Sequence, residues 1–169
     1  MRASKRIALI AVLAAVALTI FVAESQIPPI LPIPGVKLGL ANIVTLVAMV
    51  ILGRRDAFAV LAVRLVLGSV FTGSVSAFMF SAAGGIFAYL IMALLVGIFP
   101  EKLLWVVSVL AALAHNAGQM LVAIFVTGTP SIMIYILILA ASGIVTGVFT
   151  GIASLFLIRA VRRSGVVGK

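Results

Sequence analysis

The stretch Pro28–Thr45, PPILPIPGVKLGLANIVT, organises the rest of the chain. It contains four of the six prolines and leads into an apolar segment, whereas almost everything else is long apolar sequence. A proline-rich loop cannot cross a bilayer unaided, because its backbone groups would lack hydrogen-bond partners there. The loop must therefore lie at a membrane interface or fold over a cavity roofed by protein, and our working hypothesis is that it forms the lid and rim of a small-molecule site.

Composition places the chain in a membrane. Hydrophobic residues make up 65% and charged residues 9%, with a mean hydropathy of +1.44, whereas about a quarter of a soluble domain is charged. We expect residues 1–169 to form a single integral membrane domain. The net charge of +9 could suggest nucleic acid. The basic residues, however, lie at the ends of apolar segments without interleaved aromatics, so we expect no nucleic-acid partner.

The apolar segments and the turns between them predict an all-α membrane protein with six transmembrane helices. The expected spans are about 7–24, 37–53, 57–72, 76–98, 103–126 and 132–158. The first segment follows a basic N-terminus, as in a signal peptide, but no good cleavage site follows it, so we expect it to remain as a span.

The basic residues predict the orientation. Ten of the twelve lie on the side of the two termini, Lys37 lies on the opposite side, and Arg64 lies within a span. Because cytoplasmic loops are enriched in Lys and Arg, we expect a multi-pass protein of the cell membrane with both termini in the cytoplasm. Residues 25–36 would then lie outside.

Arg64 is the most costly residue in the sequence. An arginine in the middle of a span costs between about 3 and more than 10 kcal/mol, depending on water and snorkelling. It must therefore face a polar cavity, a partner or a bound anion. The alternative is a structural pairing with backbone carbonyls, Glu24 or Asp56, and the sequence leaves both interpretations open.

A second polar cluster lies within the fifth predicted span. His115, Asn116 and Gln119 are separated by three or four residues, so their side chains share one sector of a helix. We interpret the three as ligand contacts, although hydrogen bonds between helices are a serious alternative. One histidine and three scattered carboxylates make a poor ligand set, so no metal site is expected.

Lys37 begins the second predicted span, and Asn42 is a polar residue five positions inside it. A cation beside the free amides of a helix N-terminus attracts an anion, and Asn42 is the natural neighbour of such a ligand. Lys37 could instead be an interfacial lysine whose head reaches the solvent.

Ala11 and Ala15 form a small-xxx-small pair in the first predicted span. Such a pair lets another helix approach closely. The spacing fits either packing within this chain or docking of a partner.

The sequence contains no cysteine and no P-loop motif, so cysteine chemistry and ATP hydrolysis by a P-loop are excluded. Asp56 is the only aspartate, which excludes an aspartate-rich site for Mg²⁺ and diphosphate. We expect no catalytic residues, no enzymatic activity and no cofactor.

Three segments together carry a family resemblance: PIPGVKLGLANIVTL (32–46), SAAGGIFAYLIMAL (81–94) and AHNAGQMLVA (114–123). The chain resembles the Gx transporter family, also labelled heptaprenyl diphosphate synthase component I. That family is similar to the S components of energy-coupling factor (ECF) transporters, six-helix bundles that bind a small molecule under the loop between helices one and two. The resemblance implies an S-component-like bundle, with Ala11 and Ala15 docking onto a scaffold subunit.

These observations give two functional hypotheses. The first is the substrate-binding subunit of an ECF-type importer for a small, anionic or isoprenoid-related compound, working with a scaffold transmembrane subunit and an ATPase pair. Its binding residues would be Lys37, Asn42, Arg64, His115, Asn116 and Gln119. The alternative is a membrane accessory of a heptaprenyl or polyprenyl diphosphate synthase, with a soluble synthase as partner.

Overall fold

A computed structural model describes residues 3–27 and 37–165 of the chain. Across these residues the protein is helical throughout, with no strand. The long helices are α1 (Ala3–Ser25), α2 (Asn42–Leu52), α3 (Arg54–Thr72), α4 (Val75–Leu95), α5 (Leu104–Thr127) and α6 (Ile136–Arg163). Short 3₁₀ helices, Glu101–Leu103 and Pro130–Tyr135, precede α5 and α6. The proline-rich part of the predicted lid, residues 28–36, lies outside the described residues.

Turn residues explain where α3 ends and α4 begins. Gly73 takes a positive φ of 60° and closes α3 by donating its N–H to the carbonyl of Ser69, a conformation that glycine adopts without strain. Ser74 then caps α4, because its Oγ accepts a hydrogen bond of 3.2 Å from the N–H of Ala77. The turn predicted at this position from the sequence is thus present.

Four helices of the described chain are long and apolar enough to cross a membrane: α1, α4, α5 and α6, the last two counted with the 3₁₀ helices that precede them. Helix α3 has sufficient length but carries four charged residues, and α2 has only 11 residues. Large apolar side chains such as Phe125, which is 79% exposed, cover the outer surface. The fold is therefore that of an all-helical membrane protein, while the count of six spans stays a prediction.

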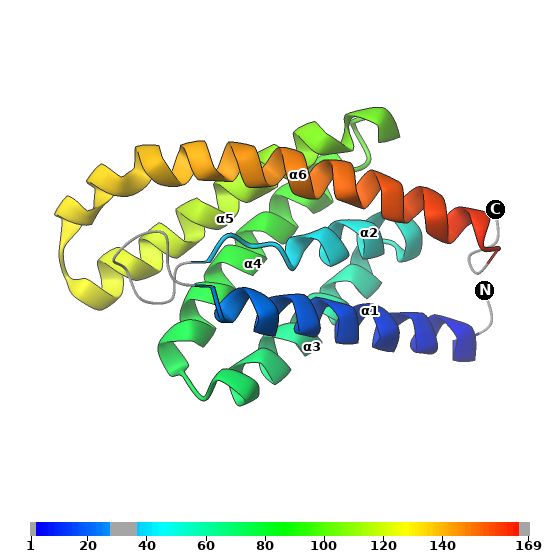
Figure 1. The fold of residues 1–169 in the computed structure, drawn as a ribbon, viewed down its shortest axis with the longest axis horizontal. Coiled ribbons are helices and arrows are strands. Elements are labelled where there is room, and N and C mark those ends of the chain that lie inside the picture. Colours follow the sequence, from blue (N-terminus) through cyan, green and yellow to red (C-terminus); the bar gives the residue numbers. More distant parts are fainter. Residues whose placement is uncertain (1–2, 28–36, 166–169) are drawn as a thin grey trace.

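Helix α2 forms the centre of the bundle. All of its residues from Asn42 to Met49 are buried, and it packs against α1, α3, α4 and α6. The second predicted span thus begins later than expected, since residues 37–39 are not helical and helix α2 starts only at Asn42. Figure 1 shows α2 running among its neighbours, with the start of α1 and the end of α6 at the same end of the bundle.

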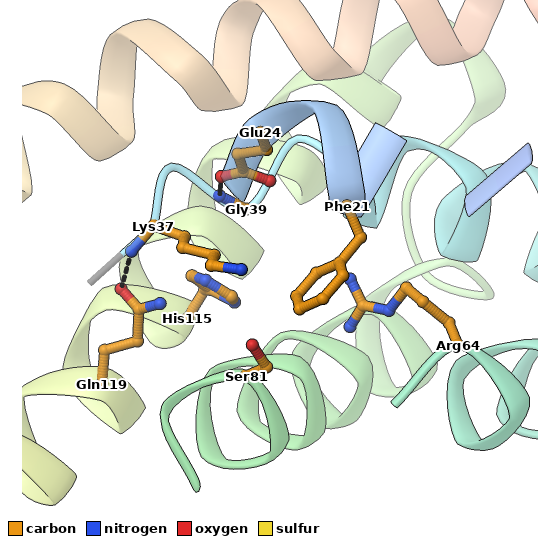
Figure 2. A pocket seen from close by; sticks show the side chains of 8 residues that line it. All are labelled: Phe21, Glu24, Lys37, Gly39, Arg64, Ser81, His115 and Gln119. Atoms are coloured by element: carbon orange, nitrogen blue, oxygen red, sulfur yellow. Dashed lines mark hydrogen bonds between the residues drawn. The ribbon is translucent and has the colours of Figure 1, made fainter. Parts of the chain in front are cut away.

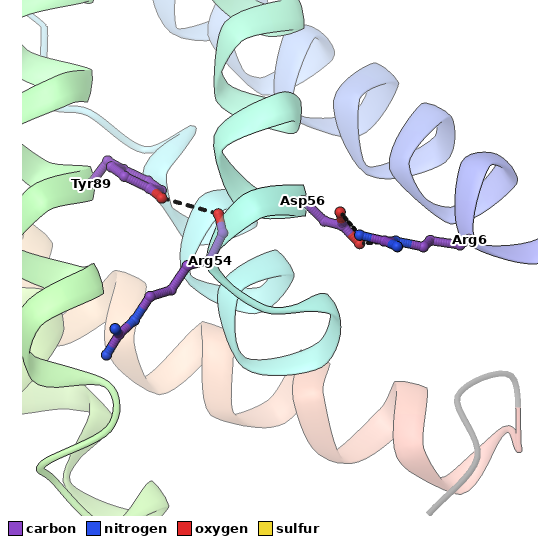
Figure 3. Close-up of polar contacts among 4 residues, drawn as sticks. All are labelled: Arg6, Arg54, Asp56 and Tyr89. Atoms are coloured by element: carbon purple, nitrogen blue, oxygen red, sulfur yellow. Dashed lines mark hydrogen bonds and ion pairs between the residues drawn. The ribbon is translucent and has the colours of Figure 1, made fainter. Parts of the chain in front are cut away.

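Polar contacts join the elements at this terminal end. The guanidinium of Arg6 in α1 donates hydrogen bonds to both carboxylate oxygens of Asp56 in α3, at 2.6 Å from Nε and 2.5 Å from Nη2. The hydroxyl of Tyr89 donates to the backbone carbonyl of Arg54 (Figure 3). The aspartate that might have neutralised Arg64 is therefore committed to Arg6. Which side of the membrane this end faces stays a prediction.

Close packing between α5 and α6 depends on glycines spaced four residues apart in α6. A Cβ atom at Gly147 would lie only 2.5 Å from the Cα of Val109, and Gly143 and Gly151 also face α5. Small residues at such positions let two helix backbones approach.

We predict that Gly147→Val lowers the free energy of unfolding by about 1–3 kcal/mol, because the added atoms overpack this contact. Thermal unfolding in detergent measures the change. Ala141→Val is the matched control, because Ala141 is exposed on the same helix and tolerates added volume. Equal stability of the two variants would contradict the packing role of Gly147.

Candidate functional site

A small cavity lies inside the bundle, in the half that is remote from the start of α1 and the end of α6. Its lining comes from α1, the segment before α2, α3, α4 and α5: Phe21, Glu24, Lys37, Gly39, Arg64, Ser81, His115 and Gln119 (Figure 2). Its volume of about 10 Å³ holds about one water molecule. The cavity reaches into the bundle as far as Arg64, which precedes the end of α3 by eight residues, or about 12 Å along the helix.

Helix α1 contributes Phe21 and Glu24 through a seven-residue pattern. Ala14, Ala17, Phe21 and Glu24 are its buried residues, and such spacing keeps side chains on one face of a helix. Glu24 lies near the end of α1, where a carboxylate usually contacts solvent. It is instead 5% exposed, because it continues the inward face by one more turn.

Glu24 binds the backbone that leads into α2. Its Oε1 accepts a hydrogen bond of 2.6 Å from the N–H of Gly39, which has a positive φ of 78°. The sequence predicted that free amides near Lys37 would attract an anion. A side chain of the protein itself supplies an anion at this position.

His115 lies at the centre of a polar chain that holds the same backbone segment. The amide nitrogen of Asn42 donates to Nδ1 of His115 at 3.2 Å. The amide of Gln119, oriented to satisfy its neighbours, accepts from Nε2 of His115 at 3.2 Å and from the N–H of Lys37 at 3.1 Å, and it donates to the carbonyl of Lys37 at 3.0 Å. Both ring nitrogens are thereby used, so His115 connects Asn42 at the start of α2 to Gln119 of α5, and Gln119 in turn holds the backbone of Lys37.

Two adjacent glycines in α4 make room for the site. A Cβ atom at Gly84 would lie 2.6 Å from Cε1 of His115, and one at Gly85 would lie 2.8 Å from Nη2 of Arg64. Small residues in membrane helices commonly serve close helix packing. Packing is present nearby, at Gly118 of α5 against the backbone of Ala83, but Gly84 and Gly85 themselves face the two polar side chains.

Arg64 is 2% exposed, and its Nε and Nη2 atoms have no hydrogen-bond partner within residues 3–27 and 37–165. The same is true of Lys37 Nζ and Ser81 Oγ. The Phe21 ring lies between the two cations (Figure 2), with Lys37 Nζ at 3.7 Å and Arg64 Cζ at 5.8 Å from its centroid. Cation–π contact offsets part of the cost of burying these charges.

The predicted site residues therefore fall into groups. Four of them line the cavity: Lys37, Arg64, His115 and Gln119. Asn42 does not line it but is hydrogen-bonded to His115. Asn116 does not line the cavity, because its amide donates to the carbonyl of Leu139 in α6 at 2.6 Å. Each step along a helix turns by about 100°, which is enough to point Asn116 and His115 at different neighbours. Their roles in binding a ligand stay predictions.

Ala11 and Ala15 are exposed on the outer face of α1. They lie outside the buried face of α1, which consists of Ala14, Ala17, Phe21 and Glu24, and partner docking there stays a prediction. No group of three or more histidine or acidic side chains gathers in the described part of the chain in a way that could hold a metal ion.

Phe21, Ser81 and Gly39 also line the cavity, and sequence reasoning did not single them out. For Phe21 and Glu24 a signal existed, because their seven-residue spacing from Ala14 and Ala17 continues the buried stripe of α1. Ser81 carried no comparable signal, since a lone serine in an apolar helix usually bonds to its own backbone.

Comparison with known proteins places the chain in a family. Residues 13–157 match the family described as heptaprenyl diphosphate synthase component I. The chain belongs to this family. No curated protein and no solved structure matches it. This agrees with the family label expected from the three sequence segments, while the resemblance to S components of ECF transporters stays a prediction.

We predict that Gln119→Leu lowers the free energy of unfolding by about 1–3 kcal/mol, because it leaves Nε2 of His115 and the backbone N–H and C=O of Lys37 without partners. Hydrogen exchange at the Lys37 and Gly39 amides should accelerate in the same variant. Gln26→Leu is the control, because Gln26 is exposed. Unchanged exchange at both amides would show that Gln119 does not hold this segment.

Proposed function

We propose that this protein is the non-catalytic membrane subunit of a prenyl diphosphate synthase, and that it holds a small-molecule ligand in the cavity beside Arg64. The observation that carries the proposal is the family match over residues 13–157. The apolar helices α1, α4, α5 and α6 support a position in the membrane. The role of the subunit would be to present or retain a ligand beside a soluble catalytic partner.

The few carboxylates of the chain support a separate catalytic subunit. Diphosphate chemistry relies on Mg²⁺ held by carboxylates, and Asp56 is the only aspartate in the sequence. Both of its oxygens bind Arg6. The catalytic partner must therefore supply the metal-binding residues.

The chemistry of the product supports a membrane subunit. A heptaprenyl diphosphate has a long apolar chain and a charged head group, so its chain partitions into a bilayer. A helical bundle with an apolar outer surface and a polar cavity suits both parts of such a molecule.

A second candidate is the substrate-binding subunit of an ECF-type importer. It is favoured by the position of the cavity, which is lined by residues near the end of α1 and so lies in the half of the bundle remote from the start of α1 and the end of α6. If both termini are cytoplasmic, this half faces outward, where an importer captures its substrate. The exposed alanines of α1 are also available for a scaffold subunit.

Co-purification of the tagged protein from its native membrane separates the two candidates. We expect recovery of a soluble prenyl diphosphate synthase in near-stoichiometric amount. Recovery of a transmembrane scaffold with an ATPase pair, and no synthase, would overturn the accessory function and support the importer.

The same preparation tests the outer face of α1. If the importer is the correct function, Ala11→Leu combined with Ala15→Leu should reduce scaffold recovery by at least about tenfold, because the larger side chains keep a helix from approaching. The control is Val12→Leu with Val16→Leu, at positions 58% and 45% exposed on the same helix. Equal recovery from both pairs would exclude docking through the alanines.

A further inference from the structure

The charged side chains that line the cavity do not balance one another. Its charged side chains are Lys37, Arg64 and Glu24, which gives two formal positive charges against one negative charge. The carboxylate of Glu24 is directed to the N–H of Gly39 and forms no ion pair with either cation in the described part of the chain. One positive charge is therefore unbalanced by these groups.

The ion pair between Arg6 and Asp56 indicates which kind of group the Nε and Nη2 atoms of Arg64 are suited to bind. Arg6 uses its Nε and Nη2 atoms to hold the two oxygens of Asp56, and this bidentate geometry is specific for carboxylate and phosphate groups. In Arg64 the same two nitrogens have no partner across the described residues. The other described glutamate, Glu101, pairs with Arg162. Of the three acidic side chains in the sequence, only Glu24 lies at the cavity, and it forms no ion pair with Arg64 in the described part of the chain.

Burial makes this arrangement costly for the empty protein. Arg64 is 2% exposed, and an unpaired charge inside a membrane bundle is far less stable than a paired one. Gly85 provides the space for the guanidinium, so the described helices accommodate the charge without an ion pair to it. A ligand that brings the missing negative charge would recover this cost on binding.

We propose that the cavity binds a carboxylate or phosphate-type head group, with two of its oxygens held by Nε and Nη2 of Arg64 and its remaining charge balanced by Lys37. The Ser81 hydroxyl, which also has no partner within residues 3–27 and 37–165, donates to the same group. The proposal rests on the proposed function only in placing a small-molecule ligand in this cavity. It adds the charge and shape of the part that is recognised.

Binding requires the Phe21 ring to move. The cavity holds about one water molecule, and the ring separates Lys37 from Arg64. Phe21 packs against Gly68, where a Cβ atom would lie 2.7 Å from its Cε1. A head group that contacts both cations therefore displaces the ring from between them.

Direct binding to the purified protein in nanodiscs tests the proposal. The probes are inorganic phosphate, inorganic diphosphate, acetate, a short prenyl diphosphate and the matching prenyl alcohol, each followed by calorimetry. We expect the prenyl diphosphate to bind at least about tenfold more tightly than the alcohol. Acetate and inorganic phosphate distinguish a carboxylate site from a phosphate site. Equal affinity for diphosphate and alcohol, or binding of no anionic probe, would overturn the proposal.

Arg64→Met gives the sharpest result. It should weaken binding of the anionic probe by at least about tenfold and raise the melting temperature of the ligand-free protein, because a buried unpaired charge is replaced by an apolar side chain of similar length. Arg55→Met is the control for net charge, since Arg55 is exposed at the start of the same helix. A lower melting temperature, with affinity within twofold of the wild type, would instead assign Arg64 a structural role.

Two further variants keep the proposal testable if Arg64→Met does not fold. Arg64→Lys retains the charge but loses the two-nitrogen edge, so anion affinity should still fall. Glu24→Gln retains the acceptor for Gly39 but removes the negative charge, so inorganic diphosphate should bind more tightly. Unchanged affinity in both variants would exclude an anion site here. Neither result depends on whether a synthase co-purifies, so this proposal can fail independently of the proposed function.

Discussion

The structure depends on satisfying a short piece of non-helical backbone inside an apolar bundle. Residues 37–39 precede helix α2 within the bundle, half-buried at Lys37 and Leu38 and buried at Gly39, where an unpaired backbone group is costly. Their polar groups are bonded instead by side chains from distant elements, Glu24 of α1 and Gln119 of α5. His115 and Asn42 extend the same chain of bonds. Much of the buried polarity of this half of the bundle therefore serves to hold the entry into α2.

Lys37, Arg64 and Ser81 differ from that set, because they offer donors that no neighbouring group in the described chain accepts. Space for the cavity side chains comes from missing Cβ atoms at Gly68, Gly84 and Gly85. Stability alone would favour an apolar residue in place of a buried unpaired arginine. Natural proteins retain such destabilising groups where function requires them, which is the physical argument for treating the cavity as a binding site.

The sequence predicted the helices well, because long apolar segments and Gly, Pro and Ser turns leave few alternatives. The sequence also singled out Arg64 as a candidate for lining a polar cavity, since the free-energy cost of an arginine within a membrane span does not depend on the fold. The sequence offered Glu24 only as a possible partner of Arg64, whereas the register of α1 turns it inward and its carboxylate bonds to the N–H of Gly39. Asn116 was grouped with His115 because helical spacing alone does not show which neighbour each side chain meets. Such choices depend on how helices pack, which a single sequence does not encode locally.

The central position of α2 has a consequence for how the protein enters the membrane. Its 11 residues span about 16 Å, roughly half of the hydrocarbon thickness. Such a segment, preceded by Lys37, is a weak candidate for independent partitioning from the translocon into lipid. Because α2 is covered by α1, α3, α4 and α6, its burial is completed only after the last helix has been synthesised. Assembly of this bundle is therefore cooperative, because the packing of α2 is completed only when all four helices around it are present.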